Sequence, residues 1–468
     1  MNLCSIHFYY KSDKHYPYEN RKRSIAINII DMANNKSFRQ VKVKIHRLGL
    51  IRDSEIVLNR MMVFIGESGL GKSYTALLSN YLFELMMSVN RMKQFFINSN
   101  KTFNKIKDDI RAQSGILFTI PKSVLIEWIN KDAVNYLRYM LNADQIDADI
   151  EFVIPSIPDI TFTYYRQAEG QSNSTKSILV ISINDTLNYS VRYDEEAQNE
   201  ETCFSVLLRF YLVQLLLGNF RSLRHNYILP PSRGTVMTEM IDGNTGLYKT
   251  FIEDFKQIEV ASPHTENVSA ALAKEVTEIL SGSVSKKNNT YYYNTFSGAE
   301  FPVSAAAASV RELAPLTMFI NRYDISMSAL LMEEPEAHLH SDKQRKMADI
   351  MSLMVANGAI VHITTHSERL LQRLQELLLL GSLMGRIDKE EFTRLCERVG
   401  ANTETVLLPD KVSGYQLVLN NDNTVRINSY DIMRDPFKMI TELHNKSVDT
   451  FSILHKYISD ALNDNNNE

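Results

Sequence analysis

The chain has 468 residues, 44% of them hydrophobic and 23% charged, and its formal net charge at pH 7 is −4. These values are typical of a globular protein with enough length for two or three domains, and the small net charge leaves nucleic-acid binding open. The isolated cysteines Cys4, Cys203 and Cys396 exclude a disulfide framework and any Cys-x-x-Cys zinc site. Because no apolar run reaches the roughly 18 residues of a membrane span and the N-terminus lacks a signal-peptide core, we expect a cytoplasmic protein without membrane contact.

The first predicted elements are strands, because residues 24–31 and 40–46 alternate apolar and polar side chains. Residues 55–58 are a third candidate strand. Basic side chains concentrate in the same region, namely Lys36, Arg39, Lys42, Lys44, His46 and Arg47. Such a run could contact the phosphate backbone of a nucleic acid, or it could be the solvated side of an edge strand.

A phosphate-loop pattern, G-x-x-x-x-G-K-S, follows the apolar run 61–65 and opens a helix-like stretch that reaches about residue 87. Glycines let the backbone curl so that several N–H groups point at one phosphate, and the helix N-terminus adds its positive end. We expect Lys72 to reach the β- and γ-phosphates and the Ser73 hydroxyl to bind Mg²⁺. An ordinary glycine-rich turn before a helix is the alternative. The residues assigned to nucleoside triphosphate binding are Gly66, Glu67, Ser68, Gly69, Leu70, Gly71, Lys72 and Ser73.

The middle of the chain mixes helical and β patterns. Residues 90–146 are mostly helical in pattern, with Pro121 at a helix start and Trp128 on an apolar stripe. Further elements follow in chain order: strands at 150–154, 160–165, 177–183 and 188–193, a helix at about 200–224, helices within 249–281 and a polar hairpin at 282–303. From residue 304 onward helix and strand alternate, which predicts a parallel α/β lobe. The polar tail 463–468 has no apolar residue to anchor it.

Residues 306–316 begin with small side chains and run into a helix. Small residues allow a phosphate to approach the backbone closely, and Ser309 places a hydroxyl at the predicted helix N-terminus. An ordinary capped helix explains the same pattern.

A second candidate for phosphate chemistry is the apolar strand of residues 330–332, which ends in Glu333 and Glu334. One carboxylate cannot both hold a metal ion and polarise the attacking water, so two adjacent acids are needed. We assign Glu333 to Mg²⁺ and Glu334 to the water.

A third apolar strand, residues 360–365, ends at His366 and Ser367. Ligands of open α/β sheets bind at the carboxyl ends of strands, so His366 could contact a γ-phosphate, although a lone histidine is often structural. His338, His340 and His362 suggest a metal site, but no His-Glu-x-x-His array accompanies them, and we expect none.

These elements, in this order, resemble the ABC-type ATPase heads of the SMC, RecF and OLD (overcoming lysogenisation defect) group, and within it the stand-alone ATPases of bacterial anti-phage systems. The similar segments are residues 66–73, 304–316, 330–340 and 363–367, with residues 229–233 as a weaker Pro-x-x-Arg turn. The resemblance implies an α/β fold, namely a P-loop NTPase head with a two-lobed mixed sheet and a largely helical insertion. It also implies four parts: 1–90 with the phosphate loop, 91–226 as a helical and β insertion, 227–440 as the C-terminal ATPase lobe, and 441–468 as a C-terminal helix and tail.

The resemblance further implies ATP and Mg²⁺ as cofactors and an ATP-sandwich homodimer in which Ser309 reads the γ-phosphate held by the other subunit. Two positions depart from the group's pattern. Glycine usually stands beside the signature serine, whereas Ala308 and Val310 flank Ser309, and Glu333 stands where many such enzymes carry aspartate.

The function that the resemblance implies is an ATPase subunit whose dimerisation controls a separately encoded effector, expected to be a nuclease, in anti-phage defence. One alternative is a RecF- or SMC-like repair ATPase acting on DNA, and another is a scaffold that binds ATP in order to restrain a partner protein. A transporter head is disfavoured because no membrane span occurs. A full OLD nuclease is disfavoured because no strand-end acid cluster follows His366.

Overall fold

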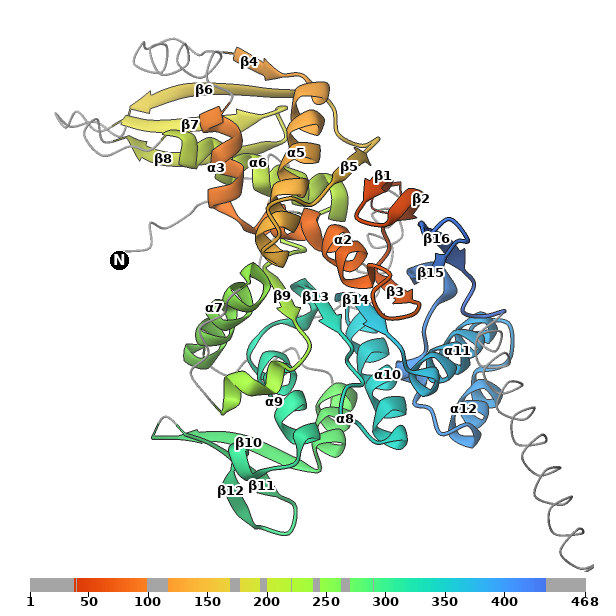
Figure 1. Cartoon of the computed structure of the whole chain (residues 1–468). Coiled ribbons are helices and arrows are strands. Elements are labelled where there is room, and N and C mark those ends of the chain that lie inside the picture. Colours follow the sequence, from red (N-terminus) through yellow and green to blue (C-terminus); the bar gives the residue numbers. More distant parts are fainter. Residues whose placement is uncertain are drawn as a thin grey trace, which may run out of the picture.

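The computed structural model describes residues 38, 40–98, 117–168, 177–193, 200–219, 221–238, 245–261, 270–288 and 290–434. The predicted strand at 24–31 and the predicted C-terminal helix and tail lie outside these residues. At the centre is a nine-stranded sheet in the order β5-β1-β2-β16-β15-β3-β14-β13-β9 (Figure 1). Its strands are β1 (Lys42–Leu48), β2 (Ile51–Val57), β3 (Met61–Ile65), β5 (Ala148–Val153), β9 (His225–Leu229), β13 (Ser328–Glu333), β14 (Ile360–Thr365), β15 (Val412–Leu419) and β16 (Val425–Tyr430).

The sheet has a parallel half and a mostly antiparallel half. Strands β9, β13, β14, β3 and β15 run parallel, and every residue of β3, β13 and β14 is buried. Their continuous apolar sequences follow from this, because a strand covered on both faces has no solvent side. Strands β5, β1 and β2 pair antiparallel, and β1 alternates buried and exposed residues. The predicted α/β fold with a two-lobed mixed sheet is confirmed.

Helices cover both faces of the parallel half. Met62 and Phe64 of β3 pack in the same hydrophobic cluster as α2 (Lys72–Met87). Met61, Val63 and Ile65 pack in a second cluster, on the other face. That cluster includes α9 (Ala308–Arg322), α10 (Ser341–Ala356) and α11 (Glu368–Leu383). The two-residue alternation of β3 therefore divides the core into two layers around the sheet.

The insertion between α2 and β9 combines helices with a small sheet. A four-stranded sheet in the order β4-β6-β7-β8 lies beside the helices, whereas β5 leaves the insertion to pair with β1 (Figure 1). The elements are α3 (Val89–Asn98), β4 (Leu117–Ile120), α5 (Lys122–Leu141), β6 (Ile160–Ala168), β7 (Ser177–Ile183), β8 (Leu187–Tyr193) and α6 (Glu200–Leu217). The strand β4, inside the segment expected to be helical, is stabilised by pairing with β6.

The C-terminal lobe adds the three-stranded sheet β10-β11-β12 at the end of the molecule away from the insertion (Figure 1). Its remaining elements are η1 (Arg233–Met237), α7 (Gly246–Val260), α8 (Ala270–Leu280), β10 (Gly282–Lys287), β11 (Thr290–Thr295), β12 (Glu300–Pro302), η2 (Val303–Ala305), η3 (Ile325–Met327), α12 (Lys389–Arg398), η4 (Thr403–Thr405) and η5 (Pro409–Lys411). Among the described helices, none has the length and apolar character that crossing a membrane requires.

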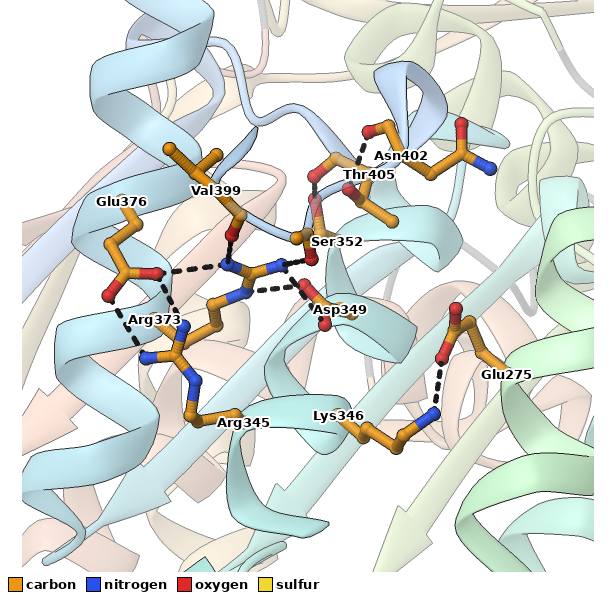
Figure 2. A network of polar contacts seen from close by, with 11 residues as sticks. Glu275, Arg345, Lys346, Asp349, Ser352, Arg373, Glu376, Val399, Asn402 and Thr405 are labelled. Carbon is orange, nitrogen blue, oxygen red and sulfur yellow. Dashed lines mark hydrogen bonds and ion pairs between the residues drawn. The ribbon is translucent and has the colours of Figure 1, made fainter. Parts of the chain in front are cut away.

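A buried arginine ties α10, α11 and the turn after α12 together (Figure 2). Arg373 donates from Nε to Asp349 Oδ1 at 2.8 Å and from Nη1 to Glu376 Oε2 at 2.9 Å. Its Nη1 and Nη2 also donate to the carbonyl oxygens of Val399 and Gly400 at 3.2 and 2.6 Å. Each charged group of this network is paired and hydrogen-bonded, so the network joins the helices without the energetic cost of an unpaired buried ion.

Candidate functional site

The phosphate loop forms as a sharp strand-to-helix connection between β3 and α2. Gly66 has φ 142°, and a Cβ there would lie 2.7 Å from the carbonyl oxygen of Leu417 in β15. Gly71, the residue before the first turn of α2, has φ 96°. Only glycine adopts these conformations without strain, so the local sequence dictates the turn.

The loop borders a cavity of about 500 Å³, within the roughly 300–1,000 Å³ typical of small-molecule sites. Three segments surround it: the turn between β1 and β2, the loop itself, and the ends of β13 and β14. The lining residues are Leu48, Gly49, Leu50, Ile51, Ser68, Gly69, Leu70, Gly71, Lys72, Ser73, Tyr74, Glu334, Thr364 and His366. Residues predicted from three separate motifs thus converge on one cavity.

Lys72 is held inside the loop. Its Nζ donates to the carbonyl oxygen of Glu67 at 2.8 Å, and the residue is buried. Burial lowers the pKa of Lys72, while the nearby carboxylates, with Glu334 first, oppose that shift. The nearby acids favour the charged form of Lys72, and its Nζ bonds to a neutral carbonyl oxygen and not to a carboxylate, so an anion in the cavity can pair with the ammonium group.

Ser73 and Glu333 form the candidate metal pair. The Ser73 hydroxyl donates a hydrogen bond to Glu333 Oε2. Glu333 is buried, and burial raises the pKa of its carboxyl group. Its second oxygen, Oε1, has no hydrogen-bond partner among the described residues. A buried carboxylate oxygen without a partner, next to a hydroxyl, fits a hard divalent cation such as Mg²⁺, which prefers oxygen ligands.

Glu334 faces the cavity from an unusual backbone conformation. Its φ is 47°, in the left-handed region that non-glycine residues rarely adopt. Its N–H donates to the carbonyl oxygen of Thr364 at 3.0 Å, which links the ends of β13 and β14. The Glu334 carboxylate is partly exposed, and its Oε1 lies 3.8 Å from His366 Nε2. The acid and the histidine are thus neighbours at the same sheet edge.

Arg233, in the Pro-x-x-Arg turn, fixes the backbone behind both acids. Only 2% of the residue is exposed. Its Nη1 donates to the Glu333 carbonyl oxygen at 3.0 Å, and its Nη2 donates to those of Glu334 at 3.4 Å and Pro335 at 3.3 Å. Its Nε donates to the Glu312 carbonyl oxygen in α9 at 3.1 Å. Arg233, whose Pro-x-x-Arg turn was only a weak signal in the sequence, therefore acts as a backbone clamp, that is, a side chain that fixes the main chain through several carbonyl oxygens.

A second clamp, which the sequence analysis missed, holds the end of β14. Glu336 Oε1 accepts hydrogen bonds from Thr365 Oγ1 at 2.6 Å and from the N–H groups of His366 at 2.9 Å and Ser367 at 3.1 Å. Its only signal in the sequence was being the third acid of the Glu-Glu-Pro-Glu string. Glu336 fixes the backbone from which His366 projects.

Ser309 is the second residue of α9, two residues after the N-cap position Ala307, and it is half-buried. It is not among the residues that line the phosphate-loop cavity. The structure therefore brings the predicted loop, acid and histidine residues together within one chain but leaves Ser309 outside that group.

The other histidines, His338, His340 and His362, do not line the phosphate-loop cavity. His362 is buried, with Nδ1 2.8 Å from Ser79 Oγ and Nε2 3.2 Å from the Asn59 carbonyl oxygen, and burial lowers its pKa to about 4. His340 lies at the surface, 3.7 Å from Asp342. Among the residues that the structure describes, no group of three or more potential ligands could hold a metal ion.

The basic residues of β1 pair with acids. Lys42 contacts Glu55 at 2.8 Å, and Lys44 and His46 contact Glu151 at 3.1 and 3.7 Å. These pairs favour the solvated interpretation over a nucleic-acid contact. The strand is not an edge strand, however, because β5 covers it. Lys36 and Arg39 lie outside the described residues.

Residues 234–371 match a family model described as an AAA ATPase domain. No curated protein is detectably similar to the chain. The solved structures that are similar include the SMC head domain from Thermotoga maritima, at 8% identity and a TM-score of 0.31, with 83% of this chain and 98% of that chain covered. They also include the Smc head domain with an extended coiled coil bound to the C-terminal domain of ScpA, derived from Pyrococcus furiosus, at 10% identity and a TM-score of 0.35, with 86% and 98% covered. Both TM-scores lie below 0.5.

The matched segment contains α9, the acids at the end of β13, and His366. The phosphate loop lies outside the match but borders the same cavity as Glu334 and His366. Residues 234–371 are therefore similar to an AAA ATPase domain, which supports ATPase activity at the level of that family.

Proposed function

We propose that the chain is an ABC-type ATPase subunit that binds and hydrolyses ATP. The observation that carries this proposal is the convergence of Lys72, Ser73, Glu334 and His366 on one cavity, with Glu333 bonded to Ser73 beneath it. These residues come from three strand ends that are separated widely in sequence and adjacent in the sheet.

Each residue has a role that its surroundings support. The backbone N–H groups of the loop and the Lys72 ammonium bind the β- and γ-phosphates. The Ser73 hydroxyl and the Glu333 carboxylate would hold Mg²⁺, which would neutralise part of the charge of the phosphates. Glu334 orients the attacking water and accepts its proton, and His366, 3.8 Å from that carboxylate, contacts the γ-phosphate.

Ser309 requires a second copy of the chain in this proposal. It lies half-buried in the first turn of α9 and does not line the cavity of its own chain, so in this proposal it acts on ATP held by a partner head. The proposed assembly is therefore an ATP-dependent homodimer with two composite sites. Glycine is absent beside Ser309, and the consequence we expect is slow closure of the two heads.

The proposed biological role is control of a separately encoded effector, a nuclease, in anti-phage defence in the cytoplasm, and it rests on the motif resemblance. The alternative of a repair ATPase acting on DNA receives no support from β1, whose basic residues are paired with acids. The scaffold alternative remains compatible with the altered signature. Comparing ATP turnover with and without duplex DNA distinguishes the repair alternative from the other two.

The decisive experiment combines two variants with a surface control. Lys72→Ala is expected to abolish tight ATP binding, because it removes the cation that pairs with the phosphates. Glu334→Gln is expected to keep ATP binding and to lower kcat about 100-fold or more, because it removes the general base. Glu390→Gln, on an exposed face of α12, is the matched control for loss of an acid and is expected to leave both unchanged.

Binding is measured with a fluorescent ATP analogue, and turnover is measured by phosphate release. Normal ATP binding by Lys72→Ala would overturn the phosphate-loop assignment. Normal turnover by Glu334→Gln, with turnover lost in Glu333→Gln, would show that the two acids have the opposite roles.

A further inference from the structure

A second cavity, of about 680 Å³, lies at the far end of α2 from the phosphate loop. Met86 and Met87, the last residues of α2, form part of its wall, whereas Lys72 and Ser73 begin the same helix. A helix of 16 residues is about 24 Å long, so the two cavities are separate. The other lining residues are Arg209, Phe210, Val213, Arg221, Leu223, Arg224 and His225, from α6, the following segment and the start of β9.

The polar side of this cavity is cationic. Three arginines, Arg209, Arg221 and Arg224, are among its lining residues together with His225. No aspartate or glutamate is among the lining residues that the structure describes. An excess of positive charge in a concave space concentrates anions there, because low-dielectric walls strengthen the field.

Arg209 has no carboxylate partner among the residues that the structure describes. Burial lowers the pKa of Arg209, and no nearby carboxylate offsets that effect. Two other arginines differ, since half-buried Arg91 pairs with Asp132 at 3.2 Å and buried Arg373 pairs with Asp349 at 2.8 Å. Arg209 is instead positioned by one hydrogen bond from Nη1 to the Met87 carbonyl oxygen at 2.8 Å. A desolvated cation without a carboxylate is a group that a bound anion would stabilise.

The backbone of Arg224 and the ring of His225 are held by neighbouring elements. The Arg224 N–H donates to the Met327 carbonyl oxygen at 2.7 Å, and the neighbouring His225 ring stacks on Tyr323 with centroids 4.0 Å apart. Planar guanidinium groups bind phosphate through two parallel hydrogen bonds, which makes arginine the preferred residue for this ligand.

The rest of the cavity is apolar, formed by Met86, Met87, Phe210, Val213 and Leu223. A free phosphate would leave this surface uncovered, whereas a nucleobase would pack against it. The concave shape also suits a small molecule better than the convex backbone of a duplex. We propose that this cavity binds a nucleoside phosphate, as a second nucleotide site independent of the phosphate loop and of whether that loop supports hydrolysis.

The test uses the full-length Lys72→Ala chain, a substitution that is expected to remove binding at the phosphate loop. AMP, inorganic phosphate and a single-stranded oligonucleotide of about 12 nucleotides are titrated by isothermal titration calorimetry. We expect one AMP site per chain and weaker binding of inorganic phosphate. Arg224→Gln is expected to weaken AMP binding about 10-fold or more, because a lost charge-assisted hydrogen bond is worth about 1.5–3 kcal/mol.

Arg224 is exposed and Arg209 supports α2, so Arg224→Gln tests the site without threatening the fold, and Arg209→Met serves only as a second variant. Arg398→Gln, at the end of α12, is the matched surface control. The proposal is wrong if AMP does not bind or if Arg224→Gln binds AMP like the control. Equal affinity for phosphate and AMP would overturn the nucleoside part, and oligonucleotide binding in preference to AMP would identify a nucleic-acid site instead.

Discussion

Replacing Arg233 with lysine tests whether the backbone clamp behind the acids matters for hydrolysis. Lysine keeps the positive charge opposite Glu312, whose Oε2 lies 3.8 Å from Arg233 Nε. Its single ammonium group, however, cannot span the carbonyl oxygens of Glu333, Glu334 and Pro335 together with that of Glu312, which the guanidinium reaches at 3.0–3.4 Å.

The expected cost follows from the lost hydrogen bonds. An ammonium group has three donors, whereas Arg233 makes five hydrogen bonds to carbonyl oxygens, so at least two are lost. At about 1.5 kcal/mol for a hydrogen bond to a charged group, the free energy of unfolding should fall by about 3 kcal/mol. Arg233→Met removes the positive charge as well and leaves the buried Glu312 carboxylate without its partner. We therefore expect a larger fall in the free energy of unfolding, about 3–5 kcal/mol.

The assay that separates structure from catalysis measures stability, ATP binding and turnover in the same preparation. Arg233→Lys should remain folded and bind a fluorescent ATP analogue with little change in Kd, because Lys72 and the loop are untouched. Its kcat should fall at least 10-fold, because Glu334 loses its fixed backbone conformation. If kcat stays normal while urea unfolding shows the lower stability, Arg233 only stabilises the fold and its effect on the acids is refuted.

Three further outcomes follow from the structure. Ser309→Arg should keep ATP binding and block ATP-dependent association in analytical ultracentrifugation, and normal association would exclude the composite site. Because the pKa of His362 falls from 6.5 to about 4 on folding, the contribution of its neutral ring to stability is complete above pH 6.5. The free energy of unfolding should fall by about 3 kcal/mol as the pH falls from 6.5 towards 4. Urea unfolding should therefore depend less steeply on pH in His362→Gln than in the unchanged chain. Burial raises the pKa of Asp254 to about 8, so ionisation of this carboxyl group opposes folding as the pH rises from about 3.8 to 8. Asp254→Asn should therefore increase the free energy of unfolding more at pH 8 than at pH 4. An equal effect of the substitution at pH 4 and pH 8 would contradict this.

The phosphate loop and the acidic strand end could be predicted because their signals are local. A buried strand, three glycines and Lys72 stand within a dozen residues, and each has one physical reason to be there. The continuous apolar runs of β13 and β14 likewise follow from burial on both faces. For the phosphate loop and these two strands, the local sequence alone is enough to predict the structure.

The clamps could not be predicted, because they join distant segments through backbone atoms. Arg233 bonds to carbonyl oxygens of residues 79 to 102 positions later, and any residue type offers such an oxygen. Glu336 binds N–H groups 30 and 31 positions later. Nor does the alternation of β1 show that β5, more than a hundred residues away, covers its edge. Such contacts depend on sheet order, which local patterns do not contain.

The conformation of Glu334 shows why residues outside the cavity matter for its chemistry. A left-handed backbone at a non-glycine residue costs on the order of 1–3 kcal/mol, so surrounding contacts must hold it in place. Those contacts are Thr364 on one side and Arg233 on the other. Arg233 lies in η1, which packs closely against α9, since a Cβ on Gly234 would lie 2.8 Å from the Arg311 carbonyl carbon. The position of the candidate general base is therefore set by the close packing of a turn against the helix that carries Ser309. We expect a substitution that separates the two to change the geometry of the proposed hydrolysis without contacting ATP.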